Sequence, residues 1–202
     1  MAELEYKPLE LAHLKAGAGY HQASLFFPRP VRFDSPACEV MTDLRLVAAA
    51  TIDGDTHMDV ANQAMIARGV RSLLVTEHGS VIGLITARDL LGERPMQVVR
   101  ERGLRHEEVR VRDIMTPQES IEVLNLADVL RSRVGHVVET LKRSGRQHAL
   151  VVETDAFSER EMVRGMFSTS QIARQLGIAI HTTEVARTFA EIEAAVSRTA
   201  DV

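Results

Sequence analysis

Gly83-Leu84-Ile85-Thr86-Ala87-Arg88-Asp89-Leu90-Leu91 has the pattern of a buried strand that passes directly into a helix. Gly165-Met166-Phe167-Ser168-Thr169-Ser170-Gln171-Ile172-Ala173 shows the same order of glycine, apolar, hydroxyl and helix-forming positions. The second stretch begins 82 residues after the first, since 165 − 83 = 82. Self-similarity within one chain indicates one structural unit used twice, so these two stretches predict a repeat.

The sequence before each stretch repeats as well. Each copy opens with a Met-Thr pair, Met41-Thr42 or Met115-Thr116. A short apolar run, a helical pattern that ends at Gly69 or Gly145, and an apolar strand then follow in both copies. This order predicts a βαββα unit in each copy, with a hairpin at Glu77-His78-Gly79-Ser80 in the first.

Two local predictions concern the first helix of each copy. In the first copy, Asp55 or Thr56 is expected to cap the helix. In the second copy, the periodicity predicts one continuous helix from Ala127 through Leu141.

A single βαββα unit leaves one face of its sheet uncovered. Two units related by a pseudo-twofold axis are therefore expected to pack sheet against sheet with their helices outside, which gives a fold of the α+β or α/β class. The linker mixes arginines and glutamates and is predicted to be a solvated connecting helix. The expected division is an N-terminal arm at 1–37, a first unit at 38–95, a linker at 96–110, a second unit at 111–177 and a C-terminal helical segment at 178–202.

Composition narrows the function classes. The 202 residues carry a net charge of −4, so no nucleic-acid partner is expected. The single cysteine, Cys38, excludes an intrachain disulfide and is expected to pack as a small core residue. No apolar run approaches the roughly 18 residues of a membrane helix, and the charged N-terminus lacks a secretory apolar region, so a cytoplasmic protein is expected. The histidines form no zinc motif and no phosphate-binding loop motif occurs, so neither a metal site nor catalysis is expected.

The ordered repeat resembles a tandem pair of CBS domains, the regulatory module named after cystathionine-β-synthase. The resemblance is carried by Val40-Met41-Thr42, Ile114-Met115-Thr116-Pro117, Gly69-Val70-Arg71-Ser72-Leu73-Leu74-Val75 and the closing stretch 83–91. It implies a module without catalytic activity that binds AMP, ADP, ATP or S-adenosylmethionine in clefts between its copies. It also implies that the chain modulates a partner protein in trans and forms a homodimer.

The resemblance further implies which residues hold the ligand. In the family, a Thr or Ser three residues before an Asp holds the ribose, and Thr86 and Asp89 match this pattern fully. A carboxylate suits this role because its charge-assisted hydrogen bonds to a cis-diol are strong. An Asp at this position serves equally well as a helix cap without any ligand. The implied first site comprises Arg71, Ser72, Thr86, Asp89, Val123, Leu124 and Ala149.

A second implied site is expected to be weaker. Gln171 stands where the first copy has Asp89, and an amide loses the charge assistance of a carboxylate. His148 in this site is either a phosphate-facing residue or a structural histidine. The implied residues are Thr51, Ile52, Gln147, His148, Ser168 and Gln171.

An alternative is a structural or interaction protein whose clefts bind no small molecule. Gln171 and the absence of proline at Leu74 favour this alternative, whereas Thr86 and Asp89 argue against it. At the two ends of the chain, the prolines near 25–31 predict an extended arm. An apolar stripe over 183–199 predicts a helix that either packs on its own module or mediates dimerisation.

Overall fold

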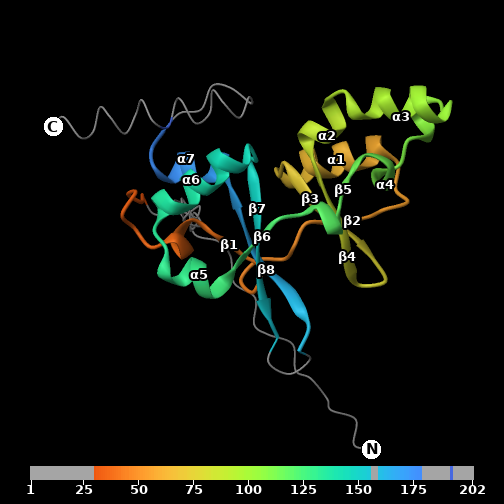
Figure 1. Cartoon of the computed structure of the whole chain (residues 1–202). Coiled ribbons are helices and arrows are strands. Elements are labelled where there is room, and N and C mark those ends of the chain that lie inside the picture. Colours follow the sequence, from red (N-terminus) through yellow and green to blue (C-terminus); the bar gives the residue numbers. More distant parts are fainter. Residues whose placement is uncertain (1–29, 156–158, 179–191, 193–202) are drawn as a thin grey trace, which may run out of the picture.

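Two four-stranded sheets lie at the centre of the computed structural model, which describes residues 30–155, 159–178 and 192 (Figure 1). The first sheet has the order β2-β3-β4-β5 and the second the order β1-β8-β7-β6. The strands of the first sheet are β2 (Thr51–Asp53), β3 (Ser72–Glu77), β4 (Ser80–Thr86) and β5 (Thr116–Pro117). Those of the second are β1 (Thr42–Asp43), β6 (Val123–Asn125), β7 (His148–Thr154) and β8 (Glu161–Ser168). The predicted α+β fold with two sheets is confirmed.

Helices accompany each sheet on its outer side (Figure 1). The first sheet is covered by α1 (Met58–Arg68), α2 (Ala87–Leu91), α3 (Arg94–Arg102) and α4 (Val111–Ile114). The second is covered by α5 (Leu126–Arg131), α6 (Val134–Ser144) and α7 (Thr169–Gln175). Three short 3₁₀ turns complete the described elements: η1 (Ala37–Val40), η2 (His106–Glu108) and η3 (Gln118–Ser120). None of the helices within the described residues is long and apolar enough to cross a membrane.

The opening strands of the two copies are exchanged between the sheets. Strand β1 belongs to the first copy in sequence, yet it pairs with β8 of the second, with Asp43 opposite Gly165. Strand β5 opens the second copy, yet it pairs with β4 of the first, with Pro117 opposite Gly83. Each sheet thus combines three strands of one copy with the opening strand of the other. The expected division at 38–95 and 111–177 follows the repeat in the sequence rather than the composition of the sheets.

The sheets are held together by an apolar cluster of matched positions. Leu74 and Leu150 occupy equivalent places on the middle strands β3 and β7, and both are buried in this cluster. Leu84 on β4 and Met166 on β8 are a second equivalent pair in the same cluster. Burial of these side chains favours sheet-on-sheet packing because it removes apolar surface of both units from water.

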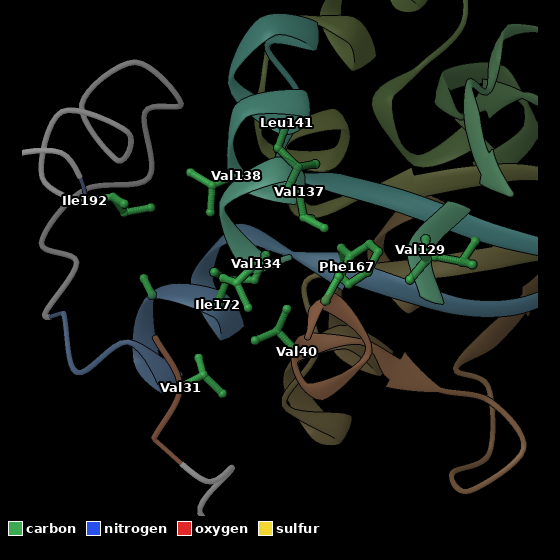
Figure 2. Packing of buried hydrophobic residues seen from close by; sticks show 13 residues of the cluster. Val31, Val40, Val129, Val134, Val137, Val138, Leu141, Phe167, Ile172 and Ile192 are labelled. Atoms are coloured by element: carbon green, nitrogen blue, oxygen red, sulfur yellow. The ribbon is translucent and has the colours of Figure 1, made fainter. Parts of the chain in front are cut away.

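Each unit also has a core of its own beneath its helices. In the second unit, Val134, Leu141 and Ile172 surround the fully buried Phe167, and Val40 joins them from the segment before β1 (Figure 2). The N-terminal segment thus packs with the second unit, in agreement with the strand exchange. The buried core of the first unit comprises Met58, Ala61, Met65, Leu73, Val75, Ile85, Leu90, Val109, Val111 and Ile114.

The continuous helix predicted from Ala127 through Leu141 is wrong, because the chain forms α5 and α6 with a break between them. The backbone at the break pairs with the N-terminal segment instead of with its own helix. Ala37 N donates to Ser132 O at 3.0 Å, and Val134 N donates to Ser35 O at 2.9 Å. Helical periodicity continues through the break, but these long-range hydrogen bonds replace the helical ones there.

The first helix begins after His57, so the predicted cap at Asp55 or Thr56 is wrong. No side chain caps this helix. Instead, the backbone N–H of Met58 donates to the carbonyl oxygen of Val109 at 3.1 Å. A returning segment of the linker therefore supplies the acceptor that a capping side chain would otherwise provide.

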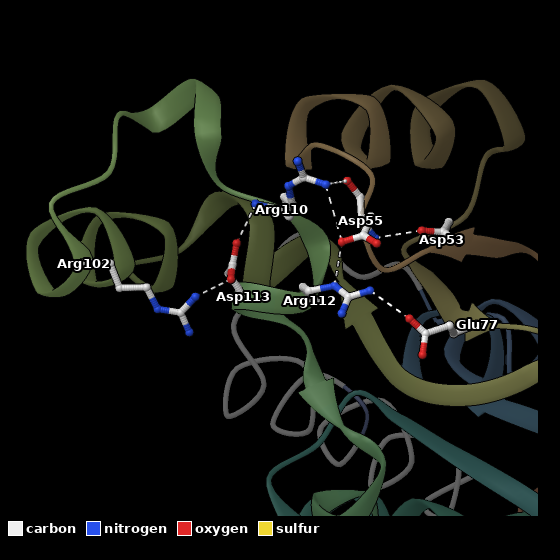
Figure 3. A network of polar contacts seen from close by, with 7 residues as sticks. All are labelled: Asp53, Asp55, Glu77, Arg102, Arg110, Arg112 and Asp113. Carbon is white, nitrogen blue, oxygen red and sulfur yellow. Dashed lines mark hydrogen bonds and ion pairs between the residues drawn. The ribbon is translucent and has the colours of Figure 1, made fainter.

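The linker packs on the first unit beyond α3, which corrects the prediction of a solvated connecting helix. Val109 and Val111 are fully buried in the first unit's core. Two arginines alternate with these valines in the sequence and meet one carboxylate (Figure 3): Arg112 Nε lies 2.9 Å from Asp55 Oδ1, and Arg110 Nη1 lies 3.4 Å from the same atom. The apolar residues at 109 and 111 thus anchor a segment whose charged neighbours suggested full exposure.

Replacing Arg112 with alanine is expected to lower the melting temperature only slightly. Arg112 also pairs with Glu77, but all three side chains of this network are more than a third exposed, and solvent screens such pairs. Thermal melts of the wild type and of Arg112→Ala in low and high salt measure the effect, and the difference should shrink as salt increases. A large difference that persists in high salt would show that this network, and not burial of Val109 and Val111, holds the linker.

The turns of the first unit follow the sequence closely. The hairpin predicted at Glu77–Ser80 is confirmed, with His78 at φ 48° and Gly79 at φ 79°, the pair of positive angles that a two-residue type I′ turn requires. Gly69 and Gly145 end α1 and α6 in the left-handed conformation, as predicted.

The ends of the chain give two further outcomes. Cys38 is exposed, not buried as expected, because Ala37 and Val40 are the residues of η1 that face the core. The extended arm predicted near 25–31 and the C-terminal helix predicted over 183–199 lie largely outside the described residues. Two residues of these segments, Val31 and Ile192, are buried in the core of the second unit, and Val31 N donates to Gln175 O at 3.0 Å.

Candidate functional site

Two cavities open where the units meet, and residues of both units line each of them. We name them the Asp89 cavity and the Arg71 cavity. The Asp89 cavity has a volume of about 740 Å³ and is lined by Leu84, Thr86, Arg88, Asp89, Gly92, Glu93, Arg94, Gln97, Thr116, Ser144, Gly145, Arg146, Gln147 and His148. The Arg71 cavity has a volume of about 360 Å³ and is lined by Thr42, Leu44, Val47, Ala48, Ala49, Ala50, Gly69, Val70, Arg71, Ser72, Leu74, His148, Leu150, Met166, Ser168, Ser170, Gln171 and Arg174. Both volumes fall within the range of small-molecule sites.

In the Asp89 cavity, Thr86 and Asp89 form a capping box at the start of α2. Asp89 Oδ2 accepts hydrogen bonds from Thr86 N at 2.9 Å and from Thr86 Oγ1 at 2.7 Å. In return, Asp89 N donates to Thr86 Oγ1 at 3.4 Å. The sequence left open whether this pair caps a helix or holds a ligand, and the structure shows that it does cap the helix.

The other oxygen of the Asp89 carboxylate is also engaged. Arg94 Nη1 donates to Asp89 Oδ1 at 3.0 Å and to Ile114 O at 3.0 Å. A carboxylate has about four acceptor positions, and three of those of Asp89 are occupied. A ribose cis-diol has two hydroxyl groups, so it would have to displace Arg94 or Thr86 to form both hydrogen bonds.

The walls of the Arg71 cavity are largely apolar. Leu74 and Leu150 come from the cluster between the sheets, and Met166 lies beside them. The run Ala48–Ala50 before β2 adds small side chains, which leave room for a flat ring. Apolar walls with a few converging polar groups are typical of sites that bind an aromatic base.

Hydroxyl and amide groups from α7 and its neighbours form one polar side of the Arg71 cavity. Thr42 Oγ1 donates to Gln171 Oε1 at 3.0 Å. Ser168 Oγ and Ser170 Oγ lie 3.0 Å apart. The amide nitrogen of Gln171 makes no hydrogen bond within the described residues, and it can therefore donate to a ligand oxygen.

Two guanidinium groups give the Arg71 cavity its charge. Arg71 comes from the first unit and Arg174 from the second, and no aspartate or glutamate lines the cavity. Neither guanidinium has a hydrogen-bond or ion-pair partner among residues 30–155 and 159–178. The lining of the Asp89 cavity contains both signs of charge, because Asp89 and Glu93 lie there together with its arginines.

His148 lines both cavities. It is 9% exposed and stands at the start of β7, where its partner in the adjacent strand is Ser168. Burial lowers the pKa of His148 to about 4, and the positive charge of Arg71 acts in the same direction while Asp89 opposes it. The imidazole is therefore neutral near pH 7 and has one donor and one acceptor nitrogen.

The structure divides the predicted ligand residues differently from the sequence. Thr86 and Asp89 share their cavity with Gln147 and His148 of the other copy, whereas Arg71 and Ser72 share theirs with Ser168 and Gln171. The face-to-face packing of the units explains this grouping. Each cavity lies between the closing strand of one unit and the segment before the middle strand of the other.

Five predicted residues line neither cavity. Leu124 and Ala149 pack against the core of the second unit, and Ile52 packs against that of the first. Thr51 and Val123 are exposed at the outer strands of their sheets. The apolar run Ala48–Ala50, immediately before β2, lines a cavity in place of Thr51 and Ile52.

Several lining residues were not among those predicted from the sequence. They include Arg94 in the Asp89 cavity and Met166 and Arg174 in the Arg71 cavity. A signal for Arg174 exists: it stands 82 residues after Gly92, at the equivalent place of the repeat, since 174 − 92 = 82. An arginine at the position of a glycine marks a chemical difference between the two cavities.

Two repeated βαββα units define a tandem module with two cavities between its halves. Residues 37–95 match the family model described as CBS domain. The first unit is therefore a CBS domain, and the second unit repeats the same architecture, as the sequence predicted.

Solved structures are similar to this chain. An uncharacterized conserved protein from Pyrococcus horikoshii is 21% identical, with a TM-score of 0.53 over 76% of this chain and 100% of that chain. CBSX2 in complex with AMP is 17% identical, with a TM-score of 0.49 over 69% and 94%. The CBS domain pair of MJ0100, in complex with 5′-methylthioadenosine and S-adenosyl-L-methionine, is 17% identical, with a TM-score of 0.49 over 71% and 96%. A comparison with curated proteins gave no match.

Proposed function

We propose that this chain is a regulatory module, not an enzyme, that binds an adenine nucleotide or S-adenosylmethionine between its two units. The Arg71 cavity carries the proposal. It combines a largely apolar wall with Arg71, Arg174 and the free amide nitrogen of Gln171. These groups suit the three parts of a nucleotide: an aromatic base, a ribose and an anionic phosphate.

Binding at this position gives a physical route to regulation. The cavity draws Arg71 from one unit and Arg174 from the other, so a ligand that contacts both favours one arrangement of the units. A ligand shifts a conformational equilibrium only through its different affinities for the two states. We propose that a partner protein in trans, bound by a homodimer of this chain in the cytoplasm, responds to that shift.

Thermal melting with AMP, ADP, ATP, S-adenosylmethionine and NAD tests the binding function. A ligand that binds only the folded state raises the melting temperature as its concentration increases. We expect one of the adenine ligands to give such a rise. If none does so, the alternative of a structural or interaction protein with empty clefts is the better description.

Calorimetry on two variants identifies the cavity that is used. Ala48→Trp fills the Arg71 cavity from an exposed position, and we expect it to abolish binding. Asp89→Ala removes the carboxylate of the other cavity, and we expect it to retain the affinity of the wild type. The opposite pattern would place the ligand in the Asp89 cavity, where the sequence resemblance alone puts the better site.

A further inference from the structure

We infer that the Arg71 cavity selects its ligand by charge, and that Arg174 is a specificity-determining residue of this site. The cavity should take adenine nucleotides with two or more negative phosphate charges in preference to adenosine or to the cationic S-adenosylmethionine. The inference rests on the proposed function, because it assumes that an adenine ligand occupies this cavity.

The positive charge of the lining is not balanced by any carboxylate that lines the cavity. The charged residues that line the cavity are Arg71 and Arg174. His148 also lines it but is neutral near pH 7. Neither has a partner among the described residues, so neither has to break an ion pair when a ligand arrives. Free guanidinium groups bind phosphate oxygens well because their donors form a planar fork.

The equivalent Asp89 cavity differs from the Arg71 cavity in its charge. Gly92 stands in the Asp89 cavity at the position that Arg174 has in the Arg71 cavity, and Arg94 there is paired with Asp89. The Asp89 cavity also contains Glu93, so its positive charge is partly balanced. The same fold therefore presents two cavities of different electrostatic character, and the Arg71 cavity is the one that favours an anion.

The charge of the lining disfavours a cationic ligand. A sulfonium ligand would bring a positive charge beside two arginines with no carboxylate in the lining to compensate. Like charges repel each other, and because Arg71 and Arg174 are exposed, this repulsion is screened by salt. Adenosine would fill the apolar part of the cavity but would leave both guanidinium groups without a partner.

Calorimetry with adenosine, AMP, ADP, ATP, pyrophosphate and S-adenosylmethionine tests the inference on the full chain. We expect affinity to rise from adenosine through AMP to ADP and ATP, and to fall as salt increases. Arg71→Gln and Arg174→Gln should each weaken ATP binding about tenfold or more, because a hydrogen bond to a charged group is lost. Both variants should reduce the ratio of the affinity for ATP to the affinity for adenosine.

Two control variants keep the test specific. Arg143→Gln removes an arginine from an exposed position on α6 that lines neither cavity, and it should bind ATP like the wild type. Arg88→Gln removes an arginine from the Asp89 cavity and should also retain the affinity. Circular dichroism and melting curves of each variant confirm that it is folded.

The outcomes separate this inference from the proposed function. If adenosine or S-adenosylmethionine binds as tightly as ATP, or if Arg174→Gln binds ATP like the wild type, selection by charge is overturned while the binding function stands. If pyrophosphate binds as tightly as ADP, the base contributes nothing and an adenine-selective site is overturned. If no adenine ligand binds, both the function and the inference fail.

Discussion

Acidification from pH 6.5 to about 4 is expected to lower the free energy of unfolding by roughly 3 kcal/mol through His148 alone. The cause is the position of His148, which is only 9% exposed and lines both cavities. The positive charge of Arg71 disfavours protonation of the imidazole further. Protonation in the folded state places a positive charge in a poorly hydrated position, whereas the unfolded chain accepts the same proton freely.

The sign of the effect follows from the two pKa values of His148. The pKa is about 4 in the folded protein and 6.5 in the unfolded chain. Between these values the unfolded chain binds more protons than the folded one, so acid favours unfolding. The contribution is therefore fully present above pH 6.5 and is lost progressively as the pH falls towards 4.

Denaturant unfolding of the wild type and His148→Ser at a series of pH values isolates this contribution. Serine is the residue that the first unit has at the equivalent position, Ser72. We expect the difference in unfolding free energy between the two proteins to change by roughly 3 kcal/mol between pH 7 and 4, as the pKa shift requires. His106→Ser, which changes an exposed histidine outside both cavities, should retain the pH dependence of the wild type. A constant difference between wild type and His148→Ser over this range would show that His148 is not held neutral by its surroundings.

The same site links stability to ligand binding. An anion placed between Arg71 and Arg174 offsets the positive charge that acts on His148. The apparent loss of stability in acid should therefore be smaller with a phosphorylated ligand bound than without it. A neutral ligand in the same cavity has no such effect, so the pH profile reports on the charge of the occupant.

The order of strands and helices was predictable because it depends on local periodicity. The two apolar runs in 72–86, separated by the turn residues His78 and Gly79, indicate a pair of strands joined by a hairpin. The glycines at 69 and 145 mark the ends of two helices. Thr86 and Asp89 were also identifiable as neighbours, since a spacing of three at a helix start brings the two side chains together.

The composition of the sheets and cavities was not predictable, because it depends on residues far apart in the chain. Nothing in the periodicity around Thr42 indicates that β1 pairs with β8 and not with its own copy. The break at Ser132 likewise depends on the hydrogen bonds that Ala37 N donates to Ser132 O and that Ser35 O accepts from Val134 N. Grouping Arg71 with Thr86 followed from the family resemblance, but the cavities lie between the sheets and separate the two residues.

Alanine at Gly165 is expected to lower the free energy of unfolding by about 1–3 kcal/mol, the range for overpacking a filled position. A Cβ atom at this glycine would lie 2.7 Å from Met41 Sδ and 2.8 Å from the carbonyl oxygen of Thr42. The methionine side chain can move, but the carbonyl belongs to β1, so the strand itself has to shift away from β8. That shift also disturbs the ion pair between Asp43 and Arg164, which holds the pKa of Asp43 below its usual range.

Equilibrium unfolding of Gly165→Ala and Met41→Ala/Gly165→Ala separates these two contributions. If the backbone of β1 is the limiting contact, the second substitution should restore only part of the lost stability. Gly83→Ala is the matched variant in the other sheet, where the new atom would lie 2.8 Å from Thr116 O of β5, and it should be destabilised similarly. In Gly54→Ala the new Cβ atom would have the end of the Ile82 side chain as its nearest neighbour, at 3.1 Å. This variant should lose less unfolding free energy than the other two. Wild-type stability of both Gly83→Ala and Gly165→Ala would contradict the exchange of β1 and β5, because only the exchanged strands approach these two glycines so closely.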